Sequence, residues 1–374
     1  MTPEPLRGPT FGSYAAEEVG WLLTDLSGVA LEAPTEEREE AIQSGGAHYA
    51  ESLPHEYQPD AAYLELYRAA LAASALRLAR AVGVVAELIM AERGRDVVLV
   101  SLARAGTPIG VLLRRWVAAR HGFAVPHYAV SIVRGRGIDP VALRHLAEHH
   151  DPADVVFVDG WTGKGAINRE LAAALVGTRF DPELAVLADP GRCTRTFGTR
   201  EDWLIASACL NSTVSGLVSR TVLNDRLIGP GMYHGAKFYA ELAPFDVSNA
   251  FLDAVAAQFP QVRDTCPPTD RAPDHAGLAC VEQIAAEYGI GDVNLVKPGV
   301  GETTRVLLRR VPWKVLASAD VPAADLAHVR LLAARRGVPV EEVPDLAYSC
   351  VGLIHPRFTR GATGADGLAA RSAR

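Results

Sequence analysis

Residues 155–166 read VVFVDGWTGKGA, and a helical pattern begins directly after them. The four apolar residues, three of them β-branched, predict a buried strand that ends at Asp159. The following loop is rich in glycine, so its backbone amides can approach an anion, and the positive end of the next helix attracts negative charge. Together they predict an anion site at the carboxyl edge of a parallel sheet.

This loop differs from two common nucleotide-binding motifs. The G-x-x-x-x-G-K-[ST] spacing of the P-loop fails here, and the dinucleotide fingerprint G-x-G-x-x-G is absent. An ordinary glycine turn after a buried strand is the simpler alternative. We favour the anion site, because a plain turn would not need so many glycines.

Strands and helices alternate on both sides of this stretch, which predicts a parallel sheet covered by helices. The expected helices are 61–93, 109–121, 141–149 and 166–175, and the expected strands are 97–101, 127–133 and 155–159. Residues 275–356 alternate again and predict a second, smaller α/β unit. The fold class is therefore α/β, with a parallel sheet between two layers of helices and a small C-terminal α/β domain.

Changes in composition suggest where the domains begin and end. The segment 263–274 contains CPPTDRAP and reads as a proline-rich linker. The last residues are rich in Gly, Ala, Ser and Arg, which is typical of disorder. We expect an N-terminal cap (1–58), a sheet domain (59–262), the linker (263–274), the second domain (275–358) and a disordered tail (359–374).

The composition is that of an ordinary globular protein. Its 374 residues carry 37 Lys plus Arg against 44 Asp plus Glu, a formal net charge of −7. This acidic total argues against a large nonspecific nucleic-acid-binding surface, although it leaves room for a local one. There are only four lysines, Lys164, Lys237, Lys297 and Lys314.

The sequence contains no cysteine framework and no segment that we expect to cross a membrane. Five cysteines are scattered, without the Cys-x-x-Cys spacing of metal sites. The apolar stretch from Leu71 to Met90 is interrupted by two arginines and a glutamate. The first residues lack the order of a signal peptide. We therefore expect a cytoplasmic protein with reduced thiols and no metal held by a direct side-chain cluster.

With these residues in view, the 155–166 segment resembles the signature of the type I phosphoribosyltransferases. That signature has four apolar residues, two acids and a Thr/Gly-rich loop for the 5-phosphate of phosphoribosyl pyrophosphate. Asp159 matches the first acid, but Gly160 stands where the family usually has the second. The resemblance implies phosphate binding by Thr162, Gly163, Lys164, Gly165 and Ala166.

Two upstream loops fit the same resemblance. Residues 97–110 read VVLVSLARAGTPIG, which is similar to the strand and pyrophosphate loop of that family. The resemblance assigns Arg104 as a pyrophosphate-binding cation, beside the amides of Ala105 and Gly106. Arg134 and Arg136 lie in a Gly/Arg loop that matches the mobile loop closing over the reacting centre.

The resemblance implies a specific reaction and its cofactor. Pyrophosphate would be displaced from the anomeric carbon of phosphoribosyl pyrophosphate, with Mg²⁺ as the cofactor. Asp159 would face the ribose hydroxyls or the metal's water shell, and the three arginines would neutralise the leaving group. The loss of the second acid at Gly160 leaves a noncatalytic sensor as an alternative.

A polar and aromatic stretch at 192–241 predicts a second part of the site. Polar and aromatic groups are unusually dense here, in a chain that is only 7% aromatic. Since phosphoribosyltransferases bind the acceptor near this part of the sheet, the resemblance implies a nucleobase-like small molecule as acceptor. The candidate acceptor-pocket residues are Ser212, Thr213, Tyr233, His234 and Lys237.

A rival hypothesis for the same stretch is nucleophilic catalysis by Cys209 with His234 as the base. The overall layout also resembles the bacterial StiP-family cysteine proteases, which keeps this alternative open. No local protease signature surrounds Cys209, and a cysteine at the end of an apolar strand is usually a core residue.

The C-terminal unit resembles the Pelota-type RNA-binding domain. Its motif, Gly-x-Asn-Glu-x-Thr-Lys at a helix start, is matched by GVGETTR at 299–305, with Gly for Asn and Arg for Lys. The resemblance implies RNA contacts from Gly299, Gly301, Glu302, Thr303, Thr304 and Arg305. A folded domain of this class without an RNA partner is the alternative.

The combined hypothesis is a phosphoribosyltransferase-like enzyme fused to an RNA-binding domain. The combination resembles proteins associated with bacterial tellurite-resistance and stress operons. The expected partners are phosphoribosyl pyrophosphate, a nucleobase-like small molecule and a structured RNA, with no membrane. A homodimer is compatible with the sequence, and neither the acceptor nor the RNA sequence is specified by it.

Overall fold

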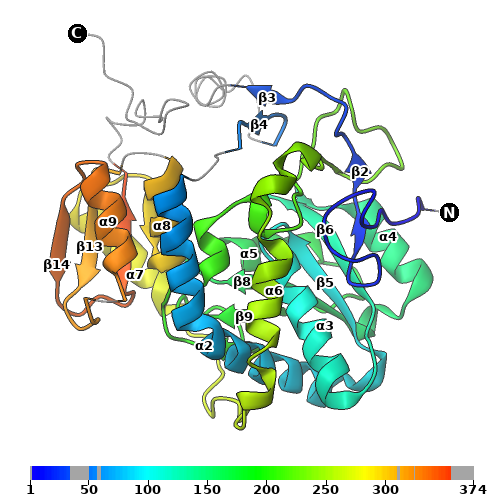
Figure 1. The fold of residues 1–374 in the computed structure, drawn as a ribbon, viewed down its shortest axis with the longest axis horizontal. Helices are drawn as coiled ribbons and strands as arrows, with labels where there is room; N and C mark the ends of the chain where they lie inside the picture. Colours follow the sequence, from blue (N-terminus) through cyan, green and yellow to red (C-terminus); the bar gives the residue numbers. More distant parts are fainter. Residues whose placement is uncertain (1, 34–49, 57–59, 310–311, 324, 355–374) are drawn as a thin grey trace.

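The computed structural model of the chain has a larger sheet unit and a smaller C-terminal unit at one end of it (Figure 1). It describes residues 2–33, 50–56, 60–309, 312–323 and 325–354. The predicted disordered tail and the part of the predicted cap at 34–49 lie outside these residues.

The sheet of the larger unit is parallel, as predicted. Its strands run in the order β1-β6-β5-β8-β9-β10, each parallel to its neighbours, with the short β7 antiparallel to β6. Their bounds are β1 Gly20–Leu22, β5 Val98–Ala103, β6 His127–Val133, β7 Gly137–Ile138, β8 Val155–Trp161, β9 Leu184–Ala188 and β10 Phe197–Thr199.

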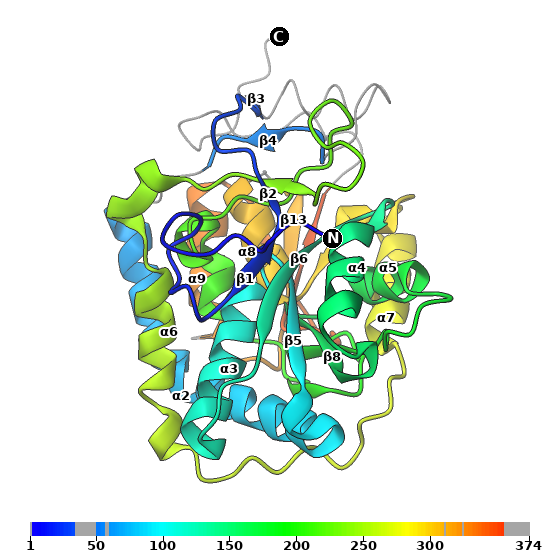
Figure 2. The same cartoon turned by 90° about the vertical axis from the view of Figure 1, so that its right-hand side faces the viewer.

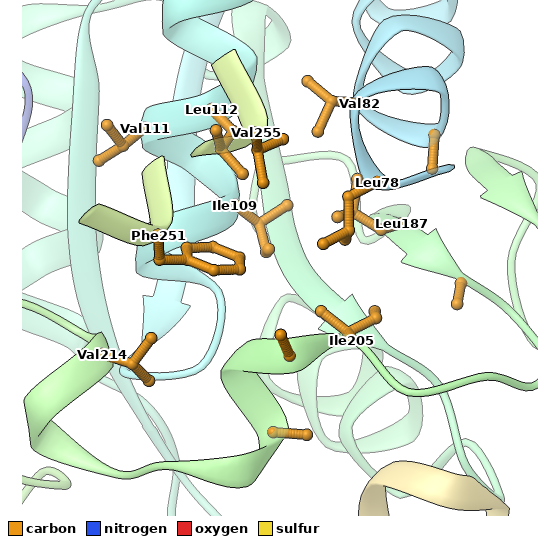
Figure 3. Close-up of a cluster of buried hydrophobic side chains, with 14 of the residues drawn as sticks. Leu78, Val82, Ile109, Val111, Leu112, Leu187, Ile205, Val214, Phe251 and Val255 are labelled. Atoms are coloured by element: carbon orange, nitrogen blue, oxygen red, sulfur yellow. The ribbon is translucent and has the colours of Figure 1, made fainter. Parts of the chain in front are cut away.

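Helices cover both faces of this sheet, which confirms the fold class. On one face α2 (Ala61–Arg93), α3 (Thr107–His121) and α6 (Ser248–Ala256) share a hydrophobic cluster, and Figure 3 shows their side chains pointing toward one another. On the other face α4 (Pro140–His149) and α5 (Ala166–Ala174) pack with the strands in a second cluster. Figure 2 shows these two groups of helices on opposite sides of the sheet.

Helix α2 is a core helix, although its composition alone is compatible with a membrane span. The helical stretch Tyr63–Asp96 is long and apolar enough to cross a bilayer, but 56% of its apolar window is buried inside the protein. Leu78 and Val82 are fully buried, and α2 packs against α3, α6 and β10. Its apolar face therefore serves the core.

The N-terminal segment contributes to the sheet rather than only capping it. Strand β1 pairs with β6, Gly20 opposite Tyr128, and so forms the edge of the sheet. Four further short strands lie in this region or pair with it: β2 (Thr24–Asp25) pairs with β11 (Gly235–Ala236), and β3 (Glu32–Ala33) with β4 (Leu53–Pro54). Two-residue and three-residue strands carry little sequence signal, which explains why they were not predicted.

The C-terminal unit has a four-stranded mixed sheet in the order β12-β15-β13-β14. Its strands are β12 Val296–Pro298, β13 Lys314–Ser318, β14 Val340–Val343 and β15 Cys350–Leu353, and its helices are α7 Ala276–Glu287, α8 Gly299–Arg309 and α9 Ala327–Arg335. Residues of α8 and α9 belong to the same hydrophobic cluster as α2, α3 and α6. The two units therefore share a core.

Short 3₁₀ helices connect the longer elements. They are η1 Gly94–Asp96, η2 Pro152–Asp154, η3 Ala206–Cys209, η4 Ser212–Val214, η5 Ala240–Phe245, η6 Phe259–Gln261 and η7 Val293–Leu295. The expectation that Cys209 lies at the end of an apolar strand is wrong, because residues 206–209 form η3.

Candidate functional site

The loop between β8 and α5 leaves backbone donors without acceptors. Gly165 occupies the N-cap position of α5 with a φ of 74°, a left-handed conformation that favours glycine, and no side chain caps the helix. Among the described residues, the amides of residues 163–166 donate to no protein acceptor. Such a helix start attracts an anion.

The hydroxyl of Thr162 braces the loop from behind. Thr162 Oγ1 donates to Asp189 Oδ1 at 2.5 Å and accepts from the amide of Gly191 at 3.2 Å. The same carboxyl oxygen accepts from the amide of Cys193 at 2.8 Å. Thr162 therefore shapes the loop, while the free amides of the loop are left for a ligand.

A cavity of about 540 Å³ lies in front of this loop, between the two units. Its volume is in the range of small-molecule sites, roughly 300–1,000 Å³. Four cationic and two acidic side chains line it. Its lining residues include Ala105, Arg134, Asp159, Trp161, Thr162, Gly163, Lys164, Gly165, Ala166, Lys297, Glu302 and Arg305.

Asp159 lines the cavity as predicted, and its carboxyl is hard to ionise. Burial raises its pKa to about 6, against the opposing effects of the Gly160 amide, which donates to it at 2.8 Å, and of Arg305. A Cβ at Gly160 would meet only Ala105 O, at 3.9 Å, so packing does not force the loss of the second acid.

Two carboxylates of the cavity, Asp159 and Glu302, could take part in holding a Mg²⁺ ion, and the Mg²⁺ cofactor stays a prediction. Magnesium is usually held by one or two carboxylates together with substrate phosphates. Here the second acid of the motif is a glycine, and the charge of Arg305 already acts on Asp159. Among the residues that the structure describes, no three His, Cys, Asp or Glu side chains could together hold a metal.

Lys164 lines the cavity, but its ammonium group binds the C-terminal unit. Its Nζ donates to Val293 O at 2.7 Å and to Val296 O at 3.0 Å. Burial lowers its pKa to about 8, against the attraction of Glu302. Lys164 therefore connects the two units, in contrast to the predicted role as a phosphate ligand.

Of the other predicted anion-binding residues, some line the cavity and others do not. Arg134 and Ala105 line the cavity. Arg104 instead pairs with Glu56 at 2.7 Å and lines a much smaller neighbouring cavity of about 20 Å³. Arg136 is half-exposed, 3.9 Å from Glu51. Gly106 packs so closely that a Cβ there would lie 2.4 Å from Val158 O, so its role is close packing of α3 against β8.

The predicted acceptor-pocket residues do not line this cavity in the described structure. Ser212 and Thr213 are buried in η4. Tyr233 donates to Pro3 O at 2.6 Å, and Lys237 pairs with Glu32 at 2.8 Å and donates to Val29 O. Tyr233 and Lys237 therefore hold the N-terminal segment against the sheet. This structural role explains polar and aromatic residues in this stretch that we had assigned to an acceptor pocket.

Cys209 and His234 do not form a catalytic pair in this structure. Cys209 is 1% exposed, and burial raises its pKa to about 12. The ring of His234 instead joins Ser131 Oγ at 2.8 Å, and its backbone amide donates to Asp139 at 2.6 Å. The thiol is therefore neutral and shielded, whereas a nucleophile needs the thiolate.

The motif of the C-terminal unit faces the sheet unit. A Cβ at Gly301 would lie 2.7 Å from Trp161 Cε2, and the guanidinium of Arg305 lies over the Trp161 ring at 4.6 Å. The hydroxyls of Thr303 and Thr304 are buried and bond Lys297 O and His328. Gly299 has a φ of 83° at the start of α8. Glu302 and Arg305 line the cavity.

Asp202 is the main residue that the sequence analysis missed. Its carboxyl accepts from the amides of Val300 at 3.0 Å and Ser349 at 2.8 Å, so it caps α8 from the other unit. Tyr348 OH also reaches across, to Gly163 O at 3.2 Å. No local sequence pattern could have found this cap, because Val300 and Ser349 lie 98 and 147 residues after Asp202 in the chain.

Comparison with known proteins identifies both parts of the chain. Residues 12–256 match the family described as tellurite-like stress resistance cysteine protease StiP. The chain belongs to the StiP family. Residues 275–356 match the PELOTA RNA binding domain. A relative from Acinetobacter baylyi named cysteine protease StiP is 36% identical over 351 residues, which are 89% of this chain and 91% of that protein.

These findings confirm the resemblance to StiP-family proteins with a Pelota-type domain, and they correct the predicted activity. The family and the relative are both named as cysteine proteases, so the prediction of a phosphoribosyltransferase is wrong. The loop signature on which it rested is compatible with phosphate binding without transfer. The rival hypothesis of a cysteine hydrolase agrees better with these names.

Proposed function

We propose that this StiP-family protein binds a phosphate-bearing small molecule in the cavity between its two units. The observation that carries the proposal is the uncapped start of α5, whose loop amides at residues 163–166 have no acceptor among the described residues and border that cavity. We place this binding in the stress resistance that the family description names.

The charge of the cavity supports the same proposal. Arg134, Lys297 and Arg305 line it together with the loop, while Lys164 adds positive charge at its edge. Asp159 and Glu302 oppose them, so cations outnumber acids. A phosphate would add charge-assisted hydrogen bonds from the loop amides and the arginines. The space exceeds that of a phosphate alone, so the ligand carries a further group.

Calorimetric titration of the full chain with ribose 5-phosphate tests the proposal. We expect binding by the wild type and weaker binding by Gly165→Ala, because its Cβ would strain a backbone φ of 74° and meet Cys193 Sγ at 3.0 Å. Gly177→Ala is the matched control, since Gly177 has a φ of 79° and open space around it. Absence of wild-type binding, or equal affinity in both variants, would overturn the proposal.

A second candidate is thiol-dependent peptide hydrolysis, favoured by the names of the family and the relative. Cys193 is the thiol that touches the cavity loop: its Sγ lies 3.8 Å from Gly163 O and 3.2 Å from Gly191 O. Burial, with Asp189 nearby, raises the pKa of Cys193 to about 12. Hydrolysis would therefore need a rearrangement that exposes and ionises a buried thiol, which is why we rank it second.

Peptidase assays on an unstructured protein substrate such as casein test the second candidate. Hydrolysis through one of the buried thiols predicts complete loss of activity in Cys193→Ser or in Cys209→Ser. Cys266→Ser is the control, because Cys266 is exposed and distant in sequence from the loop. Activity retained in both variants, and also in a variant of the third buried thiol, Cys350→Ser, would remove this candidate.

A further inference from the structure

The helix start that carries the Pelota-type motif is covered by the sheet unit. Gly301 packs against Trp161, and Asp202 accepts from the amide of Val300. The hydroxyls of Thr303 and Thr304 turn into the C-terminal unit itself. An RNA could not reach this helix start while the two units are docked.

Two side chains of the motif, Glu302 and Arg305, instead border the cavity. A Cβ at Gly163 would lie 3.0 Å from Glu302 Oε1, so this carboxyl lies directly over the loop. It is the second carboxylate of the cavity, and it comes from a different unit than Asp159.

Arg305 is a largely buried cation, and the charges of Asp159 and Arg104 act on it. Its Nε has no hydrogen-bond partner among the described residues, and it lines both the large and the small cavity. Burying a charge without a full set of partners is costly. A ligand phosphate at the loop would give the part of the guanidinium that lines the cavity a charged acceptor.

The positions of the charges point to a sugar phosphate. The loop amides, Arg134 and Arg305 supply hydrogen-bond donors for a phosphate. An ionised carboxylate only accepts hydrogen bonds, so Asp159 and Glu302 suit the hydroxyls of a sugar. A cavity of about 540 Å³ leaves room for the sugar as well as the phosphate.

We propose that the Pelota-type motif of this protein serves the ligand cavity: Arg305 binds the phosphate of a sugar phosphate and Glu302 binds its hydroxyls, so that both units bind the ligand. The inference rests on the proposed function, because it concerns the same cavity. It adds that half of the recognition comes from the C-terminal unit.

The test is calorimetric titration of the full chain with two probes, ribose 5-phosphate and inorganic phosphate. Arg305→Ala should weaken both by about tenfold or more, the usual effect of losing a charge-assisted hydrogen bond. Glu302→Gln should weaken ribose 5-phosphate while inorganic phosphate binds as well as before or more tightly, since a repelling charge has gone. Arg330→Ala is the control, because Arg330 pairs with Glu342 on the C-terminal unit, outside the cavity lining.

Arg305→Lys separates binding from docking, since lysine keeps the charge and the apolar stem but loses the planar fork. We expect an affinity between those of the wild type and Arg305→Ala. The unfolding temperatures of the two variants show how much the lost contact of the guanidinium with Trp161 weakens docking. Unaltered affinity in Arg305→Ala, with a binding wild type, would overturn this inference and leave the proposed function intact. A wild type that binds neither probe would overturn the proposed function itself.

An oligoribonucleotide provides the competing outcome. If the docked wild type binds it, and Arg305→Ala abolishes that binding while saturating ribose 5-phosphate leaves it unchanged, the motif serves RNA and the inference is wrong. If the wild type does not bind the oligoribonucleotide, or if ribose 5-phosphate displaces it, the motif serves the ligand cavity and the inference stands.

Discussion

Gly301 lies where the two units pack against each other, and this packing explains why the residue is a glycine. It stands where the Pelota motif has asparagine, and the substitution by itself suggests a lost RNA contact. In the structure the same position touches Trp161, at the end of β8. A residue without a side chain is required there because an aromatic ring fills the space.

We predict that Gly301→Asn, which restores the residue of the motif, destabilises the protein. A Cβ there would lie 2.7 Å from Trp161 Cε2, closer than real contacts allow, so the ring or the whole unit must shift. Overpacking of this kind costs about 1–3 kcal/mol. The measurement is thermal unfolding.

Gly291→Asn is the control for this prediction, since nothing lies within 4 Å of a Cβ at that position. Trp161→Ala in the same chain should relieve part of the loss in Gly301→Asn. Equal unfolding temperatures for the two asparagine variants would contradict the packing argument.

At the scale of elements, helix α8 depends on an acid from another unit for its first turn. The carboxyl of Asp202 accepts from the amides of Val300 and Ser349, as an N-cap residue would. Burial nevertheless raises the pKa of Asp202 to about 6, so burial outweighs these bonds. Because the docked C-terminal unit supplies both amides, the capping bonds of Asp202 form only when the two units are docked.

We predict that Asp202 makes the folded protein more stable near pH 4 than at pH 7. Its folded pKa lies above its unfolded pKa, so the folded state binds more protons, and this contribution is lost as pH rises through about 6. A difference of about two pKa units corresponds to at most about 3 kcal/mol. Asp202→Asn removes the titrating group.

The measurement is the difference in unfolding temperature between wild type and Asp202→Asn from pH 4 to pH 8. The wild-type advantage should shrink as pH rises. Comparing the two chains cancels Asp159, whose pKa is raised in the same direction and which both contain. A pH-independent difference would show that Asp202 does not titrate in this range.

At the scale of the whole molecule, the two units share one hydrophobic cluster. It joins Ile205 and Ala206 of the sheet unit with Val300 and Leu307 of α8. Docking is therefore part of folding, since separation would expose apolar surface from both units. This sets the arrangement apart from two domains joined only by a linker.

We predict a single cooperative unfolding transition in calorimetry, with equal calorimetric and van't Hoff enthalpies. A ligand that binds the docked form should raise the transition temperature. At a ligand concentration of a hundred times its Kd, the free energy of unfolding should rise by about 2.7 kcal/mol. Two separate transitions, with the ligand shifting only one, would contradict the shared core.

The local sequence was sufficient for the main elements and much less so for the site. The strand at 127–133 and the helix at 61–93 have the predicted bounds, because residue periodicity and β-branched runs act over short distances. The cavity loop and Asp159 were also predicted. Lys164, Arg104 and the residues of the predicted acceptor pocket were assigned to ligands, whereas they bind other parts of the chain.

By itself, the sequence determined the α/β class, the glycine-rich loop after β8 and the motif at the start of α8. Only the tertiary structure decided that these two motifs face each other across one cavity, with Trp161 under Gly301 and Asp202 capping Val300. The reason is physical: a backbone pattern acts on its neighbours in sequence, while the partners of a buried charge or a missing side chain are set by long-range packing.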